Sequence, residues 1–230
     1  MPFKLQDLLY QFFIWIKNKF LINQNLDGDR AIEWSFVAAN LRPGQGRVLD
    51  FGCGPNSYLG LITSQMGYQT TSIDLGKINW PYVHPYLKFV QSDILKSTLK
   101  PNSFDLIINC SSIEHVGLAG RYGVSQDQSD GDIKLMQQFW HALKPNALML
   151  LTIPVGQDVV FAPWHRVYGP KRLPKLLTGY RIIKKEFWVK NREKKWIQTS
   201  EKIALNKPTQ KNAYGLGCLV LQKSVLRGMP

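Results

Sequence analysis

The sequence has little cysteine, with three residues in a chain of 230 and no Cys-x-x-Cys pair. Cys53, Cys110 and Cys218 each lie in or beside an apolar, strand-like run. An odd number of cysteines without paired spacing argues against a disulfide framework and against a cysteine metal site. It favours buried, reduced thiols, and therefore a cytoplasmic protein.

The sequence also lacks an uncharged apolar run of about 18 residues, so no transmembrane helix is predicted. Acidic residues are scarce in the C-terminal part. Residues 166–230 hold 16 of the 29 Lys and Arg but three of the 16 Asp and Glu, so the whole net charge of +13 lies there. Such a region binds nucleic acid, an anionic membrane or an acidic glycan, or it is a solvated surface.

Residues 1–44 are predicted to form N-terminal helices ahead of one domain over residues 45–230. Apolar residues with helical spacing occupy positions 5, 8, 9, 12, 13, 16 and 20, and lysines flank them. The favoured interpretation is a lid helix on the domain. The alternative is peripheral contact with a membrane surface through residues 1–22. A second helix is predicted over 31–41.

A glycine turn organises the rest of the chain. Val48 and Leu49 end an apolar run, and Gly52 and Gly54 then allow a tight turn because neither carries a Cβ. An apolar pattern with helical spacing follows, so strand, turn and helix form the first unit of a nucleotide-binding α/β sheet. A dinucleotide fingerprint requires a third glycine, and Ser57 occupies that position.

Strand-like and helical segments then alternate. Strands are predicted over 69–74, 87–90, 104–110 and 147–153, with a helix over 132–143 before the last of them. A short helix is predicted within 168–178, followed by strands over 180–189 and 214–222. The polar, basic segment 190–211 is predicted to connect these two strands, because Pro208 argues against a central strand.

The glycine turn, written apolar-apolar-Asp-x-Gly-Cys-Gly, resembles the first motif of class I S-adenosylmethionine-dependent methyltransferases. Residues 45–190 also resemble an uncharacterised subgroup of that superfamily, through Ser-x-Glu-His-x-Gly-Leu from Ser112, Ile-Pro-Val-Gly from Ile153 and His-Arg-x-Tyr from His165. The resemblance implies an α/β fold: a Rossmann-like, seven-stranded, mostly parallel sheet with helices on both faces and an antiparallel last strand. It makes residues 45–230 a methyltransferase domain.

The resemblance also implies a set of residues for S-adenosylmethionine. An acid after the second strand, Asp74, would accept hydrogen bonds from the ribose hydroxyls, and an acid after the third, Asp93, would take the adenine amino group. Each acid is alternatively a helix N-cap. The full cofactor set is Asp50, Gly52, Cys53, Gly54, Asp74, Leu75, Asp93, Ile94, Asn109 and Ser111.

The acceptor side is expected after the fourth strand, at Glu114-His115. A neutral imidazole is a suitable general base for a hydroxyl, so His115 is the first candidate, with Glu114 and His165 as further catalytic candidates. The equally weighted alternative is a histidine that only orients its loop. Candidate substrate-binding residues are Arg121, Tyr122 and Arg166. Some relatives bind a metal through Glu-x-x-Glu-His, but Ser111 occupies the first Glu position here, so no metal is predicted.

The predicted activity is methyl transfer to oxygen of a small molecule or saccharide. An amine-methylating Asn/Asp-Pro-Pro-Tyr/Phe motif is missing, because Asn109-Cys110-Ser111-Ser112 stands in its place. Nucleic acid is a less favoured acceptor. Two alternatives remain, a nicotinamide-dependent oxidoreductase and a non-catalytic scaffold with the same fold. The expected location is the cytoplasm. The alternative is peripheral attachment to the inner membrane surface.

Overall fold

The computed structural model describes residues 8, 9, 12, 13, 15, 16, 26–55, 58–77, 82–120 and 124–224. The helices are α2 (Asp29–Asn40), α3 (Tyr58–Gln65), α4 (Gly131–Ala142), α5 (Arg172–Leu176) and α6 (Glu201–Leu205), with 3-10 turns η2 (Ile94–Lys96) and η3 (Ile113–His115). The strands are β1 (Arg47–Phe51), β2 (Gln69–Asp74), β3 (Leu87–Gln91), β4 (Phe104–Cys110), β5 (Leu143–Val155), β6 (Val159–Phe161), β7 (His165–Val167), β8 (Tyr180–Lys190), β9 (Trp196–Thr199) and β10 (Gly215–Lys223).

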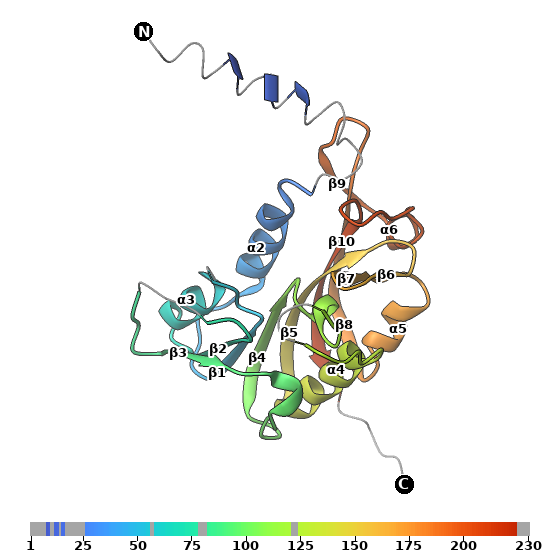
Figure 1. The fold of residues 1–230 in the computed structure, drawn as a ribbon. Coiled ribbons are helices and arrows are strands. Elements are labelled where there is room, and N and C mark those ends of the chain that lie inside the picture. The colour runs from blue at the N-terminus through green and yellow to red at the C-terminus, as the bar shows by residue number, and fades with distance from the viewer. Residues whose placement is uncertain are drawn as a thin grey trace.

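Within these residues the main sheet has eight strands in the order β3-β2-β1-β4-β5-β10-β8-β9 (Figure 1). Strands β1 to β5 pair in parallel. Strand β10 is antiparallel to both β5 and β8, and β9 is antiparallel to β8. Strands β6 and β7 form a small separate hairpin. Because β1, β2 and β4 run the same way, their carboxyl ends meet at one edge, where ligands bind in sheets of this kind.

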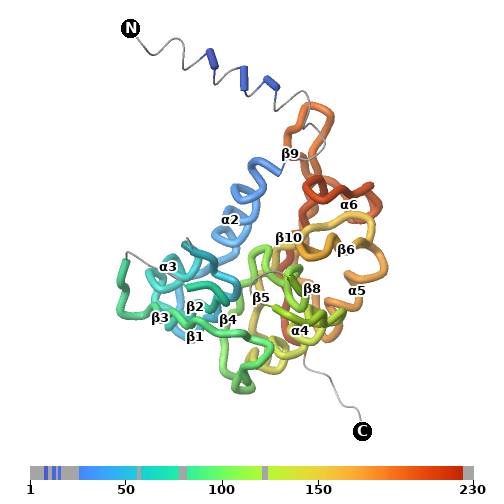
Figure 2. The backbone as a smooth tube through the Cα atoms, in the orientation of Figure 1, coloured from blue at the N-terminus to red at the C-terminus, as the bar shows by residue number. Residues whose placement is uncertain are grey.

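Helices cover both faces of the sheet (Figures 1 and 2). Successive side chains of a strand point to opposite faces. In β1, for example, Val48 packs in one core with α2 and α3, whereas Leu49 and Phe51 pack in the other core with α4, α5 and α6. Both sets are buried, which explains the continuous apolar runs that predicted these strands. All three cysteines are buried and free, as predicted.

The predicted fold class is confirmed, including the antiparallel last strand β10. The structure adds an eighth strand, β9, and the helix α6, both inside the polar segment that was predicted to be a connection. Of the first 25 positions only six are described, so most of the predicted lid helix lies outside the described residues; those six side chains are exposed. Within the described part of the chain, no helix is long and apolar enough to cross a membrane.

Candidate functional site

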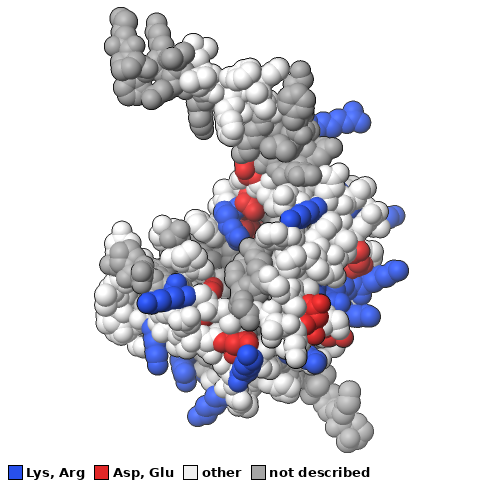
Figure 3. Space-filling view, in the orientation of Figure 1, with Lys and Arg blue, Asp and Glu red and all other residues white. Residues whose placement is uncertain are grey.

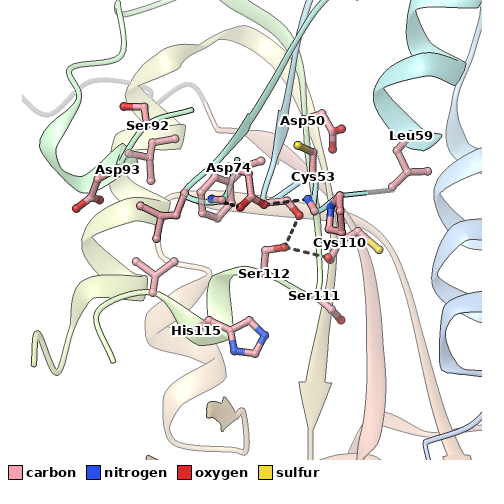
Figure 4. A pocket seen from close by; sticks show the side chains of 18 of the residues that line it. Asp50, Cys53, Leu59, Asp74, Ser92, Asp93, Cys110, Ser111, Ser112 and His115 are labelled. Atoms are coloured by element: carbon pink, nitrogen blue, oxygen red, sulfur yellow. Dashed lines mark hydrogen bonds between the residues drawn. The ribbon is translucent and has the colours of Figure 1, made fainter. Parts of the chain in front are cut away.

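A cavity of about 520 Å³ opens at the carboxyl ends of β1, β2 and β4. It is within the size range of small-molecule and cofactor sites. Ten predicted site residues line it: Asp50, Gly52, Cys53, Gly54, Asp74, Leu75, Asp93, Ile94, Ser111 and His115. Figure 4 shows Asp93 at one end of this group, Asp74 beside Cys53 near its middle, and Ser111 and His115 below them.

The glycine turn is tied to the end of β2. The backbone N–H groups of Gly52 and Cys53 donate to the carbonyl of Ile73, at 2.9 and 3.3 Å. Gly52 has a φ of +66°, and a Cβ there would collide with the side chain of Ser112, so the position requires glycine. A Cβ at Gly54 would meet nothing within 4 Å, which leaves open space for a ligand against the backbone.

Asp74 is held at both carboxylate oxygens. Oδ2 accepts from the N–H of Gly54 at 2.9 Å, and Oδ1 accepts from the N–H of Gly76 at 2.8 Å. Two backbone donors therefore fix the plane of the carboxylate at the cavity wall, and each oxygen retains a lone pair for a further donor. Asp50 lies deeper, where its Oδ2 accepts from the hydroxyl of Ser72 at 3.0 Å.

Asp93 caps the short turn η2. Its Oδ1 accepts from the N–H of Leu95 at 3.1 Å, and its Oδ2 lies 3.5 Å from the ammonium of Lys96. The N-cap alternative raised from the sequence is therefore present in the structure. The same residue lines the cavity beside Ile94 and Leu95, which supply an apolar wall.

Asn109 supports the site from below and does not line the cavity. It is fully buried, and its Oδ1 accepts from the N–H groups of Ser112 and Ile113, both at 3.3 Å. These bonds fix the start of η3, which carries Glu114 and His115. Ser111 lies between Asn109 and η3 and has a φ of +45°. A non-glycine residue adopts this conformation only when its surroundings enforce it.

Helix α2 supplies residues that the sequence did not predict. The carboxylate of Glu33 is fully buried and accepts from the hydroxyls of Ser111 and Thr152, the latter at 2.9 Å. Its second oxygen accepts from Arg30 at 2.8 Å. Burial raises the pKa of Glu33, while Arg30 and the two hydroxyls oppose that rise. Burial alone would lower the pKa of Arg30, but the neighbouring Glu33 raises it above the ordinary value.

Arg30 lines the cavity, and so do two aromatic residues, Trp34 on α2 and Tyr58 on α3. The rings of Trp34 and Tyr58 meet edge to face with centroids 5.7 Å apart. One sequence signal could have indicated that α2, which was predicted as a helix, contributes to the site. Glu33 lies three and four residues before Phe36 and Val37, so it falls on the buried face of an amphipathic helix. A carboxylate on such a face needs a polar partner in the core.

His115 is oriented by the carbonyl of Trp164, which interacts with its Nδ1. A carbonyl oxygen only accepts, so Nδ1 carries the proton of the neutral ring and Nε2 is its basic nitrogen. Nε2 lies 3.7 Å from Oε1 of Glu114. The carboxyl of Glu114 is buried away from the cavity, and this burial raises the pKa of Glu114 to about 8.

His165 lies behind His115 and does not line the cavity. It is buried, with ring centroids 6.3 Å from His115, 5.5 Å from Phe161 and 5.2 Å from Tyr214. His165 therefore packs against the predicted base His115 and has no contact with the cavity. Among the described residues, no group of three or more His, Cys, Asp and Glu side chains is arranged to hold a metal ion.

Arg166 was predicted to bind substrate, and the structure places it elsewhere. Its side chain is 1% exposed, and its guanidinium donates to four backbone carbonyls, those of Glu114, Val116, Gln128 and Ser129, at 2.6 to 3.3 Å. Arg166 therefore fastens both ends of the loop between η3 and α4. The other two predicted substrate residues, Arg121 and Tyr122, lie in that loop but outside the described residues.

Comparison with known proteins gives one family and a set of similar folds. The sequence model of the family described as "Caenorhabditis protein of unknown function, DUF268" matches residues 90–224. No curated protein matches the chain.

Three solved structures illustrate the similar folds. One is the 1,6-didemethyltoxoflavin-N1-methyltransferase of Burkholderia thailandensis with bound S-adenosylhomocysteine (TM-score 0.56, 15% identity, 98% of this chain and 91% of that chain). Another is an S-adenosylmethionine-dependent methyltransferase of Mesorhizobium loti (0.54, 16%, 84% and 99%). The third is the [4+2]-cyclase SpnF (0.56, 15%, 85% and 80%). These likenesses establish the fold, and function depends on the site.

Proposed function

The chain belongs to the DUF268 family, described as being of unknown function, and we propose that it is an S-adenosylmethionine-dependent methyltransferase. One observation carries the proposal: the Asp74 carboxylate faces the cavity with both oxygens fixed by Gly54 and Gly76. A carboxylate held there suits the two hydroxyls of a ribose. The fold, which is shared with methyltransferase structures, supports the same conclusion.

The remaining wall residues fit the other parts of S-adenosylmethionine. Leu75, Ile94 and Leu95 offer an apolar surface for the adenine, with the carboxylate of Asp93 near its amino group. The open side of Gly54 admits the chain between ribose and sulfur. Arg30, whose guanidinium Glu33 holds in place, would neutralise the carboxylate at the amino-acid end of the donor.

When bound, S-adenosylmethionine supplies an electrophilic methyl group on a positively charged sulfur. The residues of this chain then align the acceptor with that methyl group and exclude water. Nε2 of His115 takes the proton of an acceptor hydroxyl, because Nδ1 is committed to the carbonyl of Trp164. The imidazolium that results lies 3.7 Å from Glu114, and its positive charge would favour ionisation of that buried carboxyl.

We propose oxygen of a small molecule or saccharide as the methyl acceptor. The support is the placement of a histidine base at the cavity, which a hydroxyl nucleophile requires and a neutral amine does not. Incubation with methyl-labelled S-adenosylmethionine and matched panels of phenols, saccharides and primary amines tests this class. Label in the hydroxyl panels supports oxygen methylation, and label confined to the amine panel contradicts it.

Calorimetry with S-adenosylhomocysteine and with NAD tests the function without knowledge of the acceptor. We expect the wild-type chain to bind S-adenosylhomocysteine with micromolar or tighter affinity and NAD at least about 100-fold more weakly, because Ser57 replaces the third glycine of a dinucleotide site. Tight binding of NAD with no binding of S-adenosylhomocysteine would identify an oxidoreductase. Donor binding without transfer to any panel would favour a non-catalytic protein or another reaction on this fold, as in the cyclase SpnF.

Substitution of His115 by asparagine is expected to lower methyl transfer by about 10² to 10⁴-fold. The amide of asparagine can still donate toward the Trp164 carbonyl, but it lacks the basic Nε2. Affinity for S-adenosylhomocysteine should stay within about threefold of wild type, because Asp74 and the glycine turn are unchanged. Turnover of His115→Asn close to wild type would show that His115 only orients its loop.

A further inference from the structure

We propose that the N-terminal segment docks the protein on the surface of an anionic lipid bilayer. The described residues among the first 22 are Leu8, Leu9, Phe12, Phe13, Trp15 and Ile16. All six are helical, and their exposed fractions run from 37% to 66%. A group of large apolar side chains that stay in solvent marks an interaction surface.

These six side chains share one side of a helix. At about 100° per residue, positions 8, 9, 12, 13, 15 and 16 fall within roughly half a turn. The rings of Phe12 and Trp15 stack with centroids 5.9 Å apart. In Figure 1 the described residues of this segment lie away from the sheet. None of them is a charged residue, so Figure 3 draws them in white. A face rich in Leu, Phe and Trp is typical of helices that lie in a bilayer interface.

The segment joins the body beside a basic hairpin. The indole N–H of Trp196 on β9 donates to the carbonyl of Asp27 at 3.0 Å, and Gly28 lies against the same indole. The turn between β8 and β9, residues 191–195, carries Arg192, Lys194 and Lys195 against one acidic residue, Glu193. A positively charged tip thus lies close in the chain to Trp196, which holds Asp27 and Gly28, the residues just before α2.

The apolar segment and the basic tip together indicate which partner binds this surface. An apolar protein partner would bind the segment without need of the basic tip, and nucleic acid would bind the tip without need of the apolar segment. An anionic bilayer uses both, because acyl chains receive the apolar face while lipid phosphates attract the cations. Docking would also hold α2, which begins directly after this joint and carries the cavity residues Arg30 and Trp34, near the bilayer.

Flotation of the full chain with phosphatidylcholine vesicles, with and without phosphatidylglycerol, tests the proposal. We expect the chain to float with the anionic vesicles and to bind more weakly as salt rises, because screening weakens lipid attraction. The double variant Phe12→Asp/Phe13→Asp should lose more than about tenfold in vesicle affinity, since two apolar side chains no longer enter the interface. Arg192→Glu/Lys195→Glu should reduce the preference for anionic vesicles.

The matched control is Ile203→Asp on α6, an apolar side chain that is 59% exposed but lies outside the segment. It should float like wild type. The readout is lipid binding alone, so it does not depend on the proposed methyl transfer. The proposal is overturned if wild type ignores both vesicle types or if Phe12→Asp/Phe13→Asp floats normally. It is equally overturned if the wild-type chain dimerises without lipid and that double variant is monomeric, because a second copy would then cover the face.

Discussion

Asp74→Asn is expected to weaken the binding of S-adenosylhomocysteine by roughly 100-fold or more. Both oxygens of Asp74 accept from backbone N–H groups, Oδ2 from Gly54 and Oδ1 from Gly76. An asparagine amide has one acceptor and one NH₂ group. Whichever way it is turned, its NH₂ faces one of these two donors, and one ribose hydroxyl loses a charged acceptor. Calorimetry of wild type and variant measures the loss directly.

Asp105→Asn is a matched control for this substitution. Asp105 also lies in a strand of the main sheet and accepts from a backbone N–H, that of Arg47 at 2.8 Å. It lies near the start of β4, however, whereas the cavity lies where that strand ends. Its variant should bind S-adenosylhomocysteine normally. If Asp74→Asn binds within about threefold of wild type, the ribose is not held by Asp74 and the proposed orientation of the donor is wrong.

Local sequence patterns, together with the family resemblance, were sufficient to predict the architecture. The apolar runs of β1, β4 and β5 are buried on both faces, so their composition alone distinguished them from half-exposed strands. Parallel strands bring their carboxyl ends together at one edge. The resemblance named Asp74, Asp93 and Ser111 at the carboxyl ends of these strands, and all three line one cavity.

Contacts between distant segments could not be predicted in the same way. Glu33 reaches Ser111 and Thr152, which are 78 and 119 positions further along the chain. Nothing near Glu33 in the sequence indicates those partners. Arg166 shows the converse problem: it was expected to bind substrate, yet tertiary packing buries it against backbone carbonyls. Strand β9 was missed because it is only four residues long, lies within a polar and basic segment, and forms by pairing with the edge of β8.

Glu114→Gln is expected to change how the stability of the protein depends on pH. The carboxyl of Glu114 is 2% exposed, and its Oε2 has no hydrogen-bond partner among the described residues. Burial raises the pKa of Glu114 from 4.5 to about 8. Below the lower value, the folded and unfolded chains are both protonated at this group, and Glu114 contributes no pH dependence.

As the pH rises from about 4.5 toward 8, the unfolded chain releases the proton while the folded chain retains it, so the free energy of unfolding falls. The loss is complete above about pH 8 and amounts to a few kcal/mol. Glutamine has nearly the same shape and does not titrate. The variant should therefore gain stability relative to wild type across this window, with the largest gain at alkaline pH.

Urea unfolding of both proteins at about pH 5, 6.5 and 8 measures the difference in their free energy of unfolding. These pH values span the interval between the two pKa values of Glu114. Glu33, whose pKa burial also raises, is present in both chains, so its contribution cancels in the comparison. Glu193→Gln, a change at a side chain that is 71% exposed, is the control and should follow wild type at each pH. Equal pH slopes for wild type and Glu114→Gln would show that the pKa of Glu114 is the same in the folded and unfolded chains, which contradicts this prediction.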